Sequence, residues 1–421
     1  MASVAVALLP FGTWVGLAVV NSVVLVAAVV DGVRASAVVG LTRRCPDVVA
    51  VGEQATIEWR VENRGARKVA LEVADEIAPS LRASARRLSF VLPGYGRAVA
   101  TTTIRPSRRG RFEFDATEVR TAGPLGLVAM QRRRTMRHVL RVYPAFPSRR
   151  EAELRIDRAR VLEVGLRSAK GRGGGTEFDT LREYSPDDEF RRMDWSATAR
   201  TGRPIVRTYR AERNQTILLL LDVGRLMAGR VADAPRLEHA MDAVMMLTTV
   251  ATRLGDRAGL VAFDDEVRAV VPPSHSRGQL GRVTEAMYGL EPRLVESDHS
   301  SAFAEAVGRF RRRAMLVVFT ELVEHAVADT LLPALPLVLR DHLVVLASVR
   351  DPDVLSWMSG PVGDDVGDTY RRAAAIAAVE ERRRLTARLR GRGVVVVDEP
   401  PGRLAPALAD AYLRAKATGR L

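Results

Sequence analysis

The sequence predicts a membrane-anchored chain in which an all-β immunoglobulin-like sandwich precedes an α/β doubly wound domain with a mainly parallel sheet. Three observations predict this class. An uncharged apolar segment opens the chain, a region of period-two alternation follows it, and the second half alternates short apolar runs with helical patterns. With 421 residues, of which 47% are hydrophobic, the chain is long enough for two or three packed domains.

The charge balance of the chain is strongly basic, with a net charge of +14. The basic residues are nearly all arginine, because lysine occurs only at Lys68, Lys170 and Lys416, and acidic residues are interspersed with them along the whole length. A phosphate-binding face would gather positive charge on one surface, so we expect no nucleic-acid interface. The single cysteine, Cys45, excludes an intramolecular disulfide and a multi-cysteine zinc site.

An apolar segment at the start of the sequence is long enough to cross a bilayer. No charged residue precedes Asp31, and Phe11–Val30 supplies the roughly 20 mostly apolar residues that a membrane-spanning helix needs. Arg34, Arg43 and Arg44 follow closely, and an excess of basic residues beside a span favours the cytoplasmic side. We therefore expect a single-pass protein of the cell membrane, with the bulk of the chain in the cytoplasm.

From about residue 48 to residue 144 the apolar period is two, and Gly or Pro signals separate the alternating runs. Short strands at such spacing, without helical patterns between them, predict an antiparallel sandwich that serves as a spacer or docking surface. The run Arg132–Arg134 fits equally a solvated turn or a patch facing acidic lipid head groups. The expected strands are Ala55–Glu62, Val69–Val73, Arg97–Thr102, Arg111–Phe114 and Val139–Tyr143.

The next stretch has little apolar periodicity. Gly171–Gly175 is too rich in glycine for regular structure and predicts a flexible loop, without the Lys-Ser/Thr that a phosphate-binding loop needs. Glu177–Arg200 then brings acids, arginines and aromatic residues together. Such a mixture fits either an active site or a structural network of ion pairs, and the arginines close to many of the acids favour the structural interpretation.

The second half of the chain is organised around one apolar run, Ile217–Leu221. A short apolar run that stops at a Gly-containing turn predicts a central parallel strand, buried on both faces. Asp222 then lies at the carboxyl end of this strand, the edge where doubly wound sheets bind ligands. Strands alternate with helices after it, which predicts a sheet covered on both faces. The expected strands are Ala258–Phe263, Val267–Val271, Ala314–Thr320, Leu343–Val349 and Val394–Val397; the expected helices are Leu237–Leu254, Arg277–Leu290, Ser301–Arg312, Ala328–Leu339, Arg371–Leu389 and Leu404–Lys416; and Asp351–Asp368 is the expected mobile insertion.

A long motif begins at Glu177 and continues through the strand that ends at Asp222. It resembles the motif of the bacterial family catalogued as domain of unknown function 58, and the resemblance extends over essentially the whole chain. The resemblance implies a von Willebrand factor A-like domain and, as a typical neighbour and partner, an AAA+ ATPase of the MoxR type; it implies no known reaction. The signature residues are Glu177, Phe178, Leu181, Arg182, Glu183, Tyr184, Pro186, Asp188, Arg191, Asp194, Trp195, Ala199 and Arg200, followed by Gly224, Arg225 and Met227.

In metal-binding A domains, which the second half resembles, the strand edge carries Asp-x-Ser-x-Ser, and these oxygens hold a hard cation such as magnesium. This chain keeps the carboxylate of Asp222, but Gly224 and Leu226 stand where the two serines should be. We predict that the Arg225 guanidinium pairs with Asp222 or Glu321 and substitutes for the ion. No cofactor is expected, with Asp222 and Glu321 as the minor candidates for holding Mg²⁺.

These features predict a non-enzymatic protein-interaction module with a degenerate metal-dependent adhesion site, an adaptor or partner of a MoxR-type AAA+ ATPase or its client. Two alternatives remain: an enzyme that uses Glu177–Arg200 for general acid and base catalysis, and a scaffold for cell-envelope assembly. Ser300 or Ser301 replaces the threonine of the metal pattern, and Asp264–Asp265 forms a turn. The expected interaction edge comprises Asp222, Gly224, Arg225, Met227, Ser300, Ser301, Thr320 and Glu321. The expected domains are an anchor at 1–31, a juxtamembrane linker at 32–47, the sandwich at 48–146, the signature segment at 147–213 and the A-like domain at 214–417.

Overall fold

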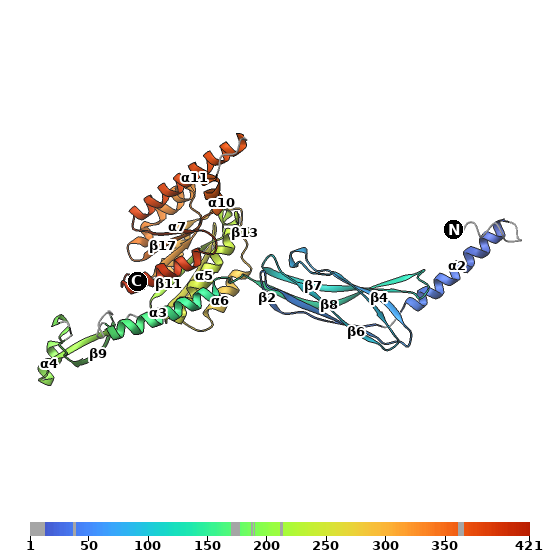
Figure 1. Cartoon of the computed structure of the whole chain (residues 1–421), viewed down its shortest axis with the longest axis horizontal. Coiled ribbons are helices and arrows are strands. Elements are labelled where there is room, and N and C mark those ends of the chain that lie inside the picture. The colour runs from blue at the N-terminus through green and yellow to red at the C-terminus, as the bar shows by residue number, and fades with distance from the viewer. Residues whose placement is uncertain are drawn as a thin grey trace. The chain divides into compact units, whose positions relative to one another are not determined.

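The computed structural model describes residues 13–36, 39–169, 177–186, 188, 190–210, 214–360 and 366–421 of the chain. The chain divides into two compact units, residues 1–143 and residues 144–421 (Figure 1). The first unit joins an apolar helix to a β-sandwich. The second unit joins a six-stranded sheet with its helices to a helix and a two-stranded ribbon.

The apolar helix α2 spans Thr13–Ala35 and exposes most of its valine and leucine side chains. Among the described residues it is the helix that is long and apolar enough to cross a membrane. Residues 32–47, expected as a linker, are mostly regular structure, because α2 continues to Ala35 and a strand of the sandwich, β1 (Val39–Arg44), follows. Asp31 does not break the helix, since its carboxylate is buried against the sandwich.

Two sheets form the sandwich, with strand orders β1-β3-β6 and β2-β8-β7-β4-β5. All the ladders are antiparallel except β2 with β8. Side chains alternate between the two faces of each strand, and those on the inner face fill the core between the sheets, which includes Trp59, Phe114 and Leu140. The remaining strands are β2 (Val48–Ala50), β3 (Ala55–Asn63), β4 (Val69–Asp75), β5 (Arg87–Leu92), β6 (Arg97–Ile104), β7 (Gly110–Ala122) and β8 (Ala129–Tyr143), with the 3-10 helix η2 (Pro79–Leu81) before β5.

A buried ion pair lies inside the sandwich. Arg43 Nη1 lies 2.8 Å from Asp75 Oδ2, and the guanidinium lies over the rings of Trp59 and Phe114 at 5.5 and 5.0 Å. Burial raises the pKa of Asp75, and Arg43 opposes that rise. Arg43 therefore cannot act as the juxtamembrane cation predicted from the sequence, because its side chain is only 2% exposed.

The hairpin of β7 and β8 is the longest in the sandwich and contains Arg132–Arg134. These arginines pair with Thr117–Val119 along the ladder, so the expected turn is wrong and the arginines belong to a strand. Cys45 is half-buried just beyond β1, and its burial raises the pKa of the thiol to about 12. The thiol therefore stays protonated and unreactive at neutral pH.

The signature segment forms a helix and a small ribbon at the start of the second unit. Helix α3 (Arg149–Ala169) precedes β9 (Glu177–Glu183), which pairs antiparallel with β10 (Ile205–Arg210). Between these strands lie the 3-10 helix η3 (Phe190–Arg192) and the helix α4 (Trp195–Thr201). The expected Gly171–Gly175 loop lies outside the described residues.

The large sheet of the second unit has the order β15-β14-β11-β16-β17-β18. Five strands are parallel and only β15, at one edge, is antiparallel to its neighbour. In order of sequence this is the 3-2-1-4-5-6 arrangement of doubly wound sheets, with the central strand β11 flanked on both sides. The strands are β11 (Thr216–Asp222), β14 (Arg257–Phe263), β15 (Val267–Ser274), β16 (Met315–Phe319), β17 (Leu343–Val349) and β18 (Val395–Glu399), and β12 (Arg230–Val231) pairs with β13 (Ala234–Pro235) apart from them.

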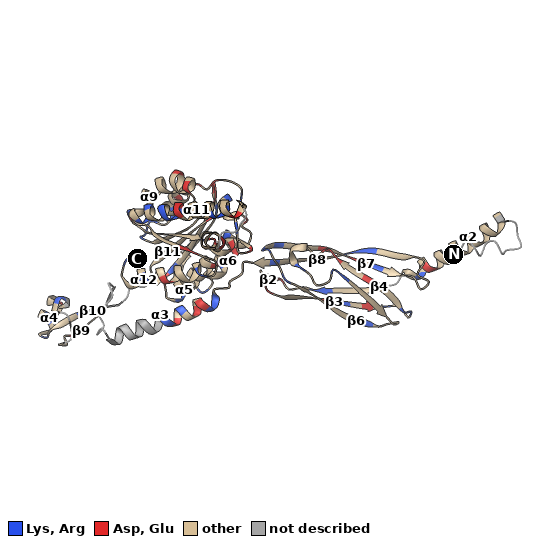
Figure 2. Cartoon of the chain, turned by 45° about the horizontal axis from the view of Figure 1, so that its top comes forward, with Lys and Arg blue, Asp and Glu red and all other residues tan. Residues whose placement is uncertain are grey.

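Helices cover both faces of this sheet, because alternate residues of β11 point to opposite sides. Ile217, Leu219 and Leu221 pack with α5 and α12, whereas Leu218 and Leu220 pack with α7 and α11. Figure 2 shows basic and acidic residues interspersed along α3 and α11. The helices are α5 (Arg236–Arg253), α6 (Gln279–Tyr288), α7 (His299–Arg309), α8 (Leu332–Ala334), α9 (Pro336–Leu339), α10 (Pro352–Ser359), α11 (Val366–Gly391) and α12 (Leu404–Ala417), with the short turns η4 (Arg225–Ala228) and η5 (Ala326–Leu331).

Two expected elements differ from the structure. Ala328–Leu339 is not one helix: it starts within the π-helical turn η5 and continues as α8 and α9, with prolines at positions 333 and 336. The expected insertion, Asp351–Asp368, contains the helix α10, whose first turn is capped by the Asp351 carboxylate accepting from Asp353 N at 2.9 Å. Residues 361–365 lie outside the described residues.

Candidate functional site

The candidate site lies at the carboxyl edge of the large sheet, where Asp222 ends β11. Its side chain is 1% exposed and accepts three hydrogen bonds. Gly224 N and Ser297 Oγ donate to Oδ1 at 2.7 and 2.5 Å, and Thr320 Oγ1 donates to Oδ2 at 2.6 Å. The structure therefore brings Asp222, Gly224 and Thr320 together, as predicted from the sequence.

Ser297 supplies the hydroxyl that the sequence analysis assigned to Ser300 or Ser301. The backbone amides of those two serines instead donate to Asp298 Oδ1, which caps α7. A Cβ at Gly224 would lie 2.1 Å from Ser297 Oγ and 3.0 Å from Val295 O. Position 224 thus has no room for the serine of a metal-binding A domain.

The predicted pairing of Arg225 with Asp222 or Glu321 is wrong. The 3-10 turn η4 carries Arg225 outward, where its Nη2 forms an ion pair with Glu296 and lies 3.0 Å from His325 Nε2. Its side chain is 44% exposed, so it is available to solvent and does not fill the edge. Met227 in the same turn points inward and is 2% exposed in the core.

Glu321 nevertheless has an internal cation, supplied by two other arginines. Arg382 Nη1 donates to Glu321 Oε1 at 2.5 Å, and Arg236 Nε lies 3.0 Å from Oε2. Arg382 also forms two hydrogen bonds with Asp398, and its Nη2 donates to Ser348 Oγ at 2.8 Å. Burial lowers the pKa of Arg382, but its bonds to Asp398 and Glu321 outweigh burial and hold it above its usual value.

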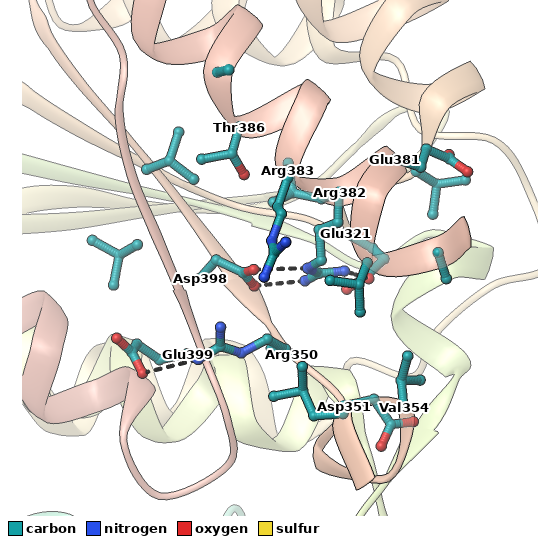
Figure 3. A pocket seen from close by; sticks show the side chains of 18 of the residues that line it. Glu321, Arg350, Asp351, Val354, Glu381, Arg382, Arg383, Thr386, Asp398 and Glu399 are labelled. Carbon is teal, nitrogen blue, oxygen red and sulfur yellow. Dashed lines mark hydrogen bonds and ion pairs between the residues drawn. The ribbon is translucent and has the colours of Figure 1, made fainter. Parts of the chain in front are cut away.

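A groove of about 930 Å³ opens beside this cluster, between α11 and the ends of β16, β17 and β18. Figure 3 shows Arg382 directed at Asp398 and Glu321, and Arg350 directed at Glu399 across the groove. Arg350 Nη2 lies 3.6 Å from Glu399 Oε2. The charged lining is Arg236, Glu321, Arg350, Asp351, Glu381, Arg382, Arg383, Arg390, Asp398, Glu399 and Arg414.

A second acidic group, Asp264–Glu266, lies at the turn between β14 and β15. Its carboxylate oxygens are within 4.8 Å of one another. The Asp264 carboxylate accepts from Glu266 N at 3.1 Å, which is the geometry of the turn expected from the sequence. Arg293 Nη1 lies within 3.5 Å of all three carboxylates, so an arginine already stands where these oxygens converge.

In Glu177–Arg200, the acids whose side chains are described, Glu183, Asp188 and Asp194, are each paired with an arginine. Arg182 donates to Asp188, Arg203 Nη1 to Glu183 at 2.8 Å, and Arg207 Nε to Asp194 at 2.8 Å. The other Asp194 oxygen accepts from Ala197 N and caps α4, and this backbone bond and Arg207 hold the pKa of Asp194 below its usual value. Glu177, Phe178, Leu181, Arg182 and Glu183 lie in β9, Tyr184, Pro186 and Asp188 follow it, Arg191 lies in η3, and Trp195, Ala199 and Arg200 lie in α4; the side chains of Glu177 and Phe178 are outside the described set.

Sequence reasoning missed Arg236, Ser297, Ser348, Arg382 and Asp398. Two of these had a usable signal, because Ser348 and Asp398 stand at the carboxyl ends of predicted parallel strands, which meet at one edge. Arg382 had no such signal, since it lies in the middle of a long arginine-rich helix and only the packing of α11 selects it.

The fold and the site define an α/β domain whose carboxyl edge is closed by internal ion pairs, in a chain that also carries a β-sandwich and an apolar helix. Residues 180–357 match the family described as "Protein of unknown function DUF58". Uncharacterized proteins of Mycobacterium tuberculosis and Mycobacterium bovis are 28% identical over 211 residues. That alignment covers 50% of this chain and 64% of each relative, so it spans slightly less than two thirds of the relatives' length.

Solved structures also resemble part of the chain. The CARDB domain of a Pyrococcus furiosus protein, crystallised in complex with di-metal ions, is 16% identical with a TM-score of 0.19. A solution structure of the same domain is 15% identical with a TM-score of 0.17. Each comparison covers 25% of this chain and 93% of the other.

Proposed function

We propose that this chain is a membrane-anchored, non-enzymatic protein-interaction module. Helix α2 is the anchor, the sandwich is a spacer, and the carboxyl edge of the large sheet receives a protein partner. The observation that carries the proposal is the ion-pair cluster of Arg236, Glu321, Arg382 and Asp398, whose buried charges neutralise one another beside an open groove.

Fixed ion pairs of this kind favour recognition over bond chemistry. A guanidinium is always protonated, so it cannot exchange a proton with Glu321 or Asp398 as a general acid or base would. The exposed charges of the groove, such as Arg383 and Glu381, are instead suited to a partner of complementary charge. The enzyme alternative loses support for the same reason, because Glu183, Asp188 and Asp194 are each paired with an arginine.

We further infer that the second unit is von Willebrand factor A-like, with a degenerate metal site. The strand order and the ligand edge at Asp222 support this inference. Both carboxylates that were candidates for Mg²⁺ have their oxygens engaged by hydrogen-bond donors, and Gly224 has no space for a further hydroxyl ligand. The edge is therefore proposed to work without a metal.

We propose a MoxR-type AAA+ ATPase, or its client, as the partner, on the strength of the resemblance to the family. A cytoplasmic position of the second unit follows from this choice, because the ATPase needs ATP. The exposed Arg34, in the last turn of α2, and Arg44, at the end of β1, favour the same orientation. A scaffold for cell-envelope assembly would use the same anchor and edge without an ATPase.

Binding of the full chain, in lipid nanodiscs, to a purified MoxR-type ATPase of the same organism tests the proposal. The double variant Arg383→Glu with Arg414→Glu reverses two exposed groove charges, and Arg384→Glu reverses a neighbouring charge on α11 that does not line the groove. We expect the double variant to weaken binding at least about tenfold, roughly 1.4 kcal/mol, and the control to bind as the unaltered chain does. Equal binding by all three proteins would exclude the groove as the docking site. An unaltered chain that binds no ATPase would leave the scaffold alternative.

A further inference from the structure

The last turn of α2 is joined to the sandwich by a buried carboxylate. Asp31 is 0% exposed and accepts three backbone hydrogen bonds from the loop between β7 and β8. Leu125 N donates to Oδ1 at 2.7 Å, and Leu127 N and Val128 N donate to Oδ2 at 2.8 and 2.9 Å. Because a buried carboxylate is costly unless its oxygens are satisfied, this geometry fixes the loop against the helix.

Two further contacts tighten the same junction. Thr121 Oγ1 donates to Ala35 O, the last carbonyl of α2, at 2.6 Å. A Cβ at Gly123 would lie 2.3 Å from Asp31 Cγ, so only glycine allows this approach. The loop between Gly123 and Val128, which we call the β7–β8 loop, is therefore shaped to hold the helix.

The β7–β8 loop exposes apolar side chains that the sandwich does not use. Leu125 is 58% exposed and Leu127 is 54% exposed, on either side of Gly126. Nothing in the sandwich core requires leucine at either position, because neither side chain belongs to the buried cluster. Exposed apolar side chains at a loop tip are typical of a surface that meets another apolar medium.

Strand register brings two more loops to the same end of the sandwich. Val69 pairs with Leu92 and Ala70 with Ala122, so the turns that precede β4 and follow β5 and β7 lie together. Val39, at the start of the strand that follows α2, pairs with Asn63, so this end is also the end at which α2 enters. The neighbouring turns present Arg64, Arg67, Lys68 and Tyr95, and Tyr95 is 71% exposed.

The position of this end relative to a bilayer follows from Asp31, given the anchor role of α2 proposed above. Asp31 is the first charged residue after the apolar run, so it lies where the hydrocarbon ends. The amides that bind it belong to Leu125, Leu127 and Val128, so the β7–β8 loop lies at the same depth.

We propose that this end of the sandwich rests on the bilayer, with Leu125 and Leu127 of the β7–β8 loop inserted at the boundary between head groups and acyl chains. Tyr95 sits at head-group level, the usual place of an amphipathic aromatic ring at a membrane surface. The basic residues of the neighbouring turn, Arg67 and Lys68, face the lipid phosphates. Lipid is the binding partner of this apolar surface, and its contacts hold the sandwich in one orientation relative to the membrane.

Spin labels on the full chain test this inference in vesicles of phosphatidylcholine with phosphatidylglycerol. In a Cys45→Ala background, single cysteines replace Leu125 and Leu127 in the loop. A cysteine in place of Val48, which is 51% exposed, is the matched control. Val48 pairs with Arg141 of β8, and at about 3.3 Å per residue Arg141 lies about 40 Å along that strand from the β7–β8 loop. Val24, in the middle of α2, reports whether the helix spans the bilayer.

We expect labels at positions 125 and 127 to collide with oxygen and to show a several-fold loss of collisions with a water-soluble nickel chelate, relative to the label at position 48. If the labels at 125 and 127 meet nickel as often as the label at 48 does, while the label at 24 is shielded, the inference is overturned and the anchor stands. A label at 24 that is itself open to nickel overturns the anchor, and the inference with it.

Discussion

Arg382 and Asp398 form a bidentate ion pair, with Nε 2.8 Å from Oδ2 and Nη2 2.7 Å from Oδ1. The same guanidinium reaches Glu321 beyond the end of β16, so one side chain from α11 ties two strands of the sheet together at their carboxyl ends. Both partners of the pair are less than a fifth exposed, so the interaction is only weakly screened by water.

Replacing Arg382 should be far more damaging than replacing the arginine beside it. The Arg382→Ala variant leaves Asp398 without its cation and leaves Glu321 with Arg236 alone, and breaking such a buried pair costs about 3–5 kcal/mol of unfolding free energy. Arg383→Ala, at an exposed position of the same helix, should cost less than about 0.5 kcal/mol. Urea unfolding of the detergent-solubilised chain measures both, and a similar small loss in the two variants would contradict the cluster's structural role.

The close approach of Gly224 and Ser297 predicts a coupled pair of substitutions. Gly224→Ala places a Cβ 2.1 Å from Ser297 Oγ and should destabilise the chain by about 1–3 kcal/mol. The double variant with Ser297→Ala removes the clashing hydroxyl, so the two effects should not add. A double-mutant cycle by urea unfolding gives the coupling energy; additive losses would place Ser297 away from Gly224.

Gly123 should tolerate no side chain. Gly123→Ala pushes a Cβ against the Asp31 carboxylate, which is held on three amides and cannot retreat without losing them. We expect hydrogen exchange of the amides of Leu125, Leu127 and Val128 to rise at least about tenfold, roughly 1.4 kcal/mol of local stability. Gly65→Ala is the control, because its Cβ would make only an ordinary contact with Asn63 at 3.5 Å. Unchanged hydrogen exchange in the Gly123→Ala chain would show that the Asp31 carboxylate does not hold the β7–β8 loop.

His299 predicts a dependence of stability on pH. Its ring is 1% exposed, its Nδ1 is 2.9 Å from Thr330 Oγ1, and burial lowers its pKa more strongly than the nearby Asp222 and Asp298 raise it. Below pH 6.5 the unfolded chain therefore binds a proton that the folded chain resists, and the folded state loses up to about 1.4 kcal/mol per pH unit from this group.

The matched variants His299→Gln and His325→Gln isolate that effect. His299→Gln should flatten the fall in unfolding free energy between pH 6.5 and pH 5, measured against the unaltered chain. The control variant His325→Gln replaces a histidine whose side chain is 45% exposed in the same unit, and it leaves the buried ring of His299 in place. If the unfolding free energy falls equally with pH in all three chains, His299 takes up its proton in the folded state as well.

Local patterns predicted the large sheet well. The strand Leu343–Val349 has the predicted bounds, because an apolar run buried on both faces and closed by polar residues permits little else. Shorter sandwich strands were missed: β1 lies in what looked like a linker, since Thr42, Arg43 and Arg44 gave it no apolar character. Only the pairing of Arg43 with Asp75 inside the core explains that composition.

The position of the candidate site in the sheet was predictable from the sequence, but the residues that pair with its carboxylates were not. Asp222 and Thr320 meet because Asp222 ends β11 and Thr320 directly follows β16, and these parallel strands are neighbours in the sheet. The cation for Glu321 comes instead from Arg382, 61 positions further along the chain, which no local pattern identifies. Arg225 is the arginine nearest to Asp222 in sequence, but the η4 turn directs it to solvent.

The carboxylate of Asp31 also bears on whether α2 is retained or cleaved. A peptidase that removed α2 as a signal sequence would leave three loop amides without their acceptor and Gly123 beside a void. In such a processed chain the β7–β8 loop would have lost the helix that it binds. With α2 as the proposed anchor, the sandwich makes these contacts only in a chain that keeps the helix, which would couple maturation of this domain to insertion of the chain.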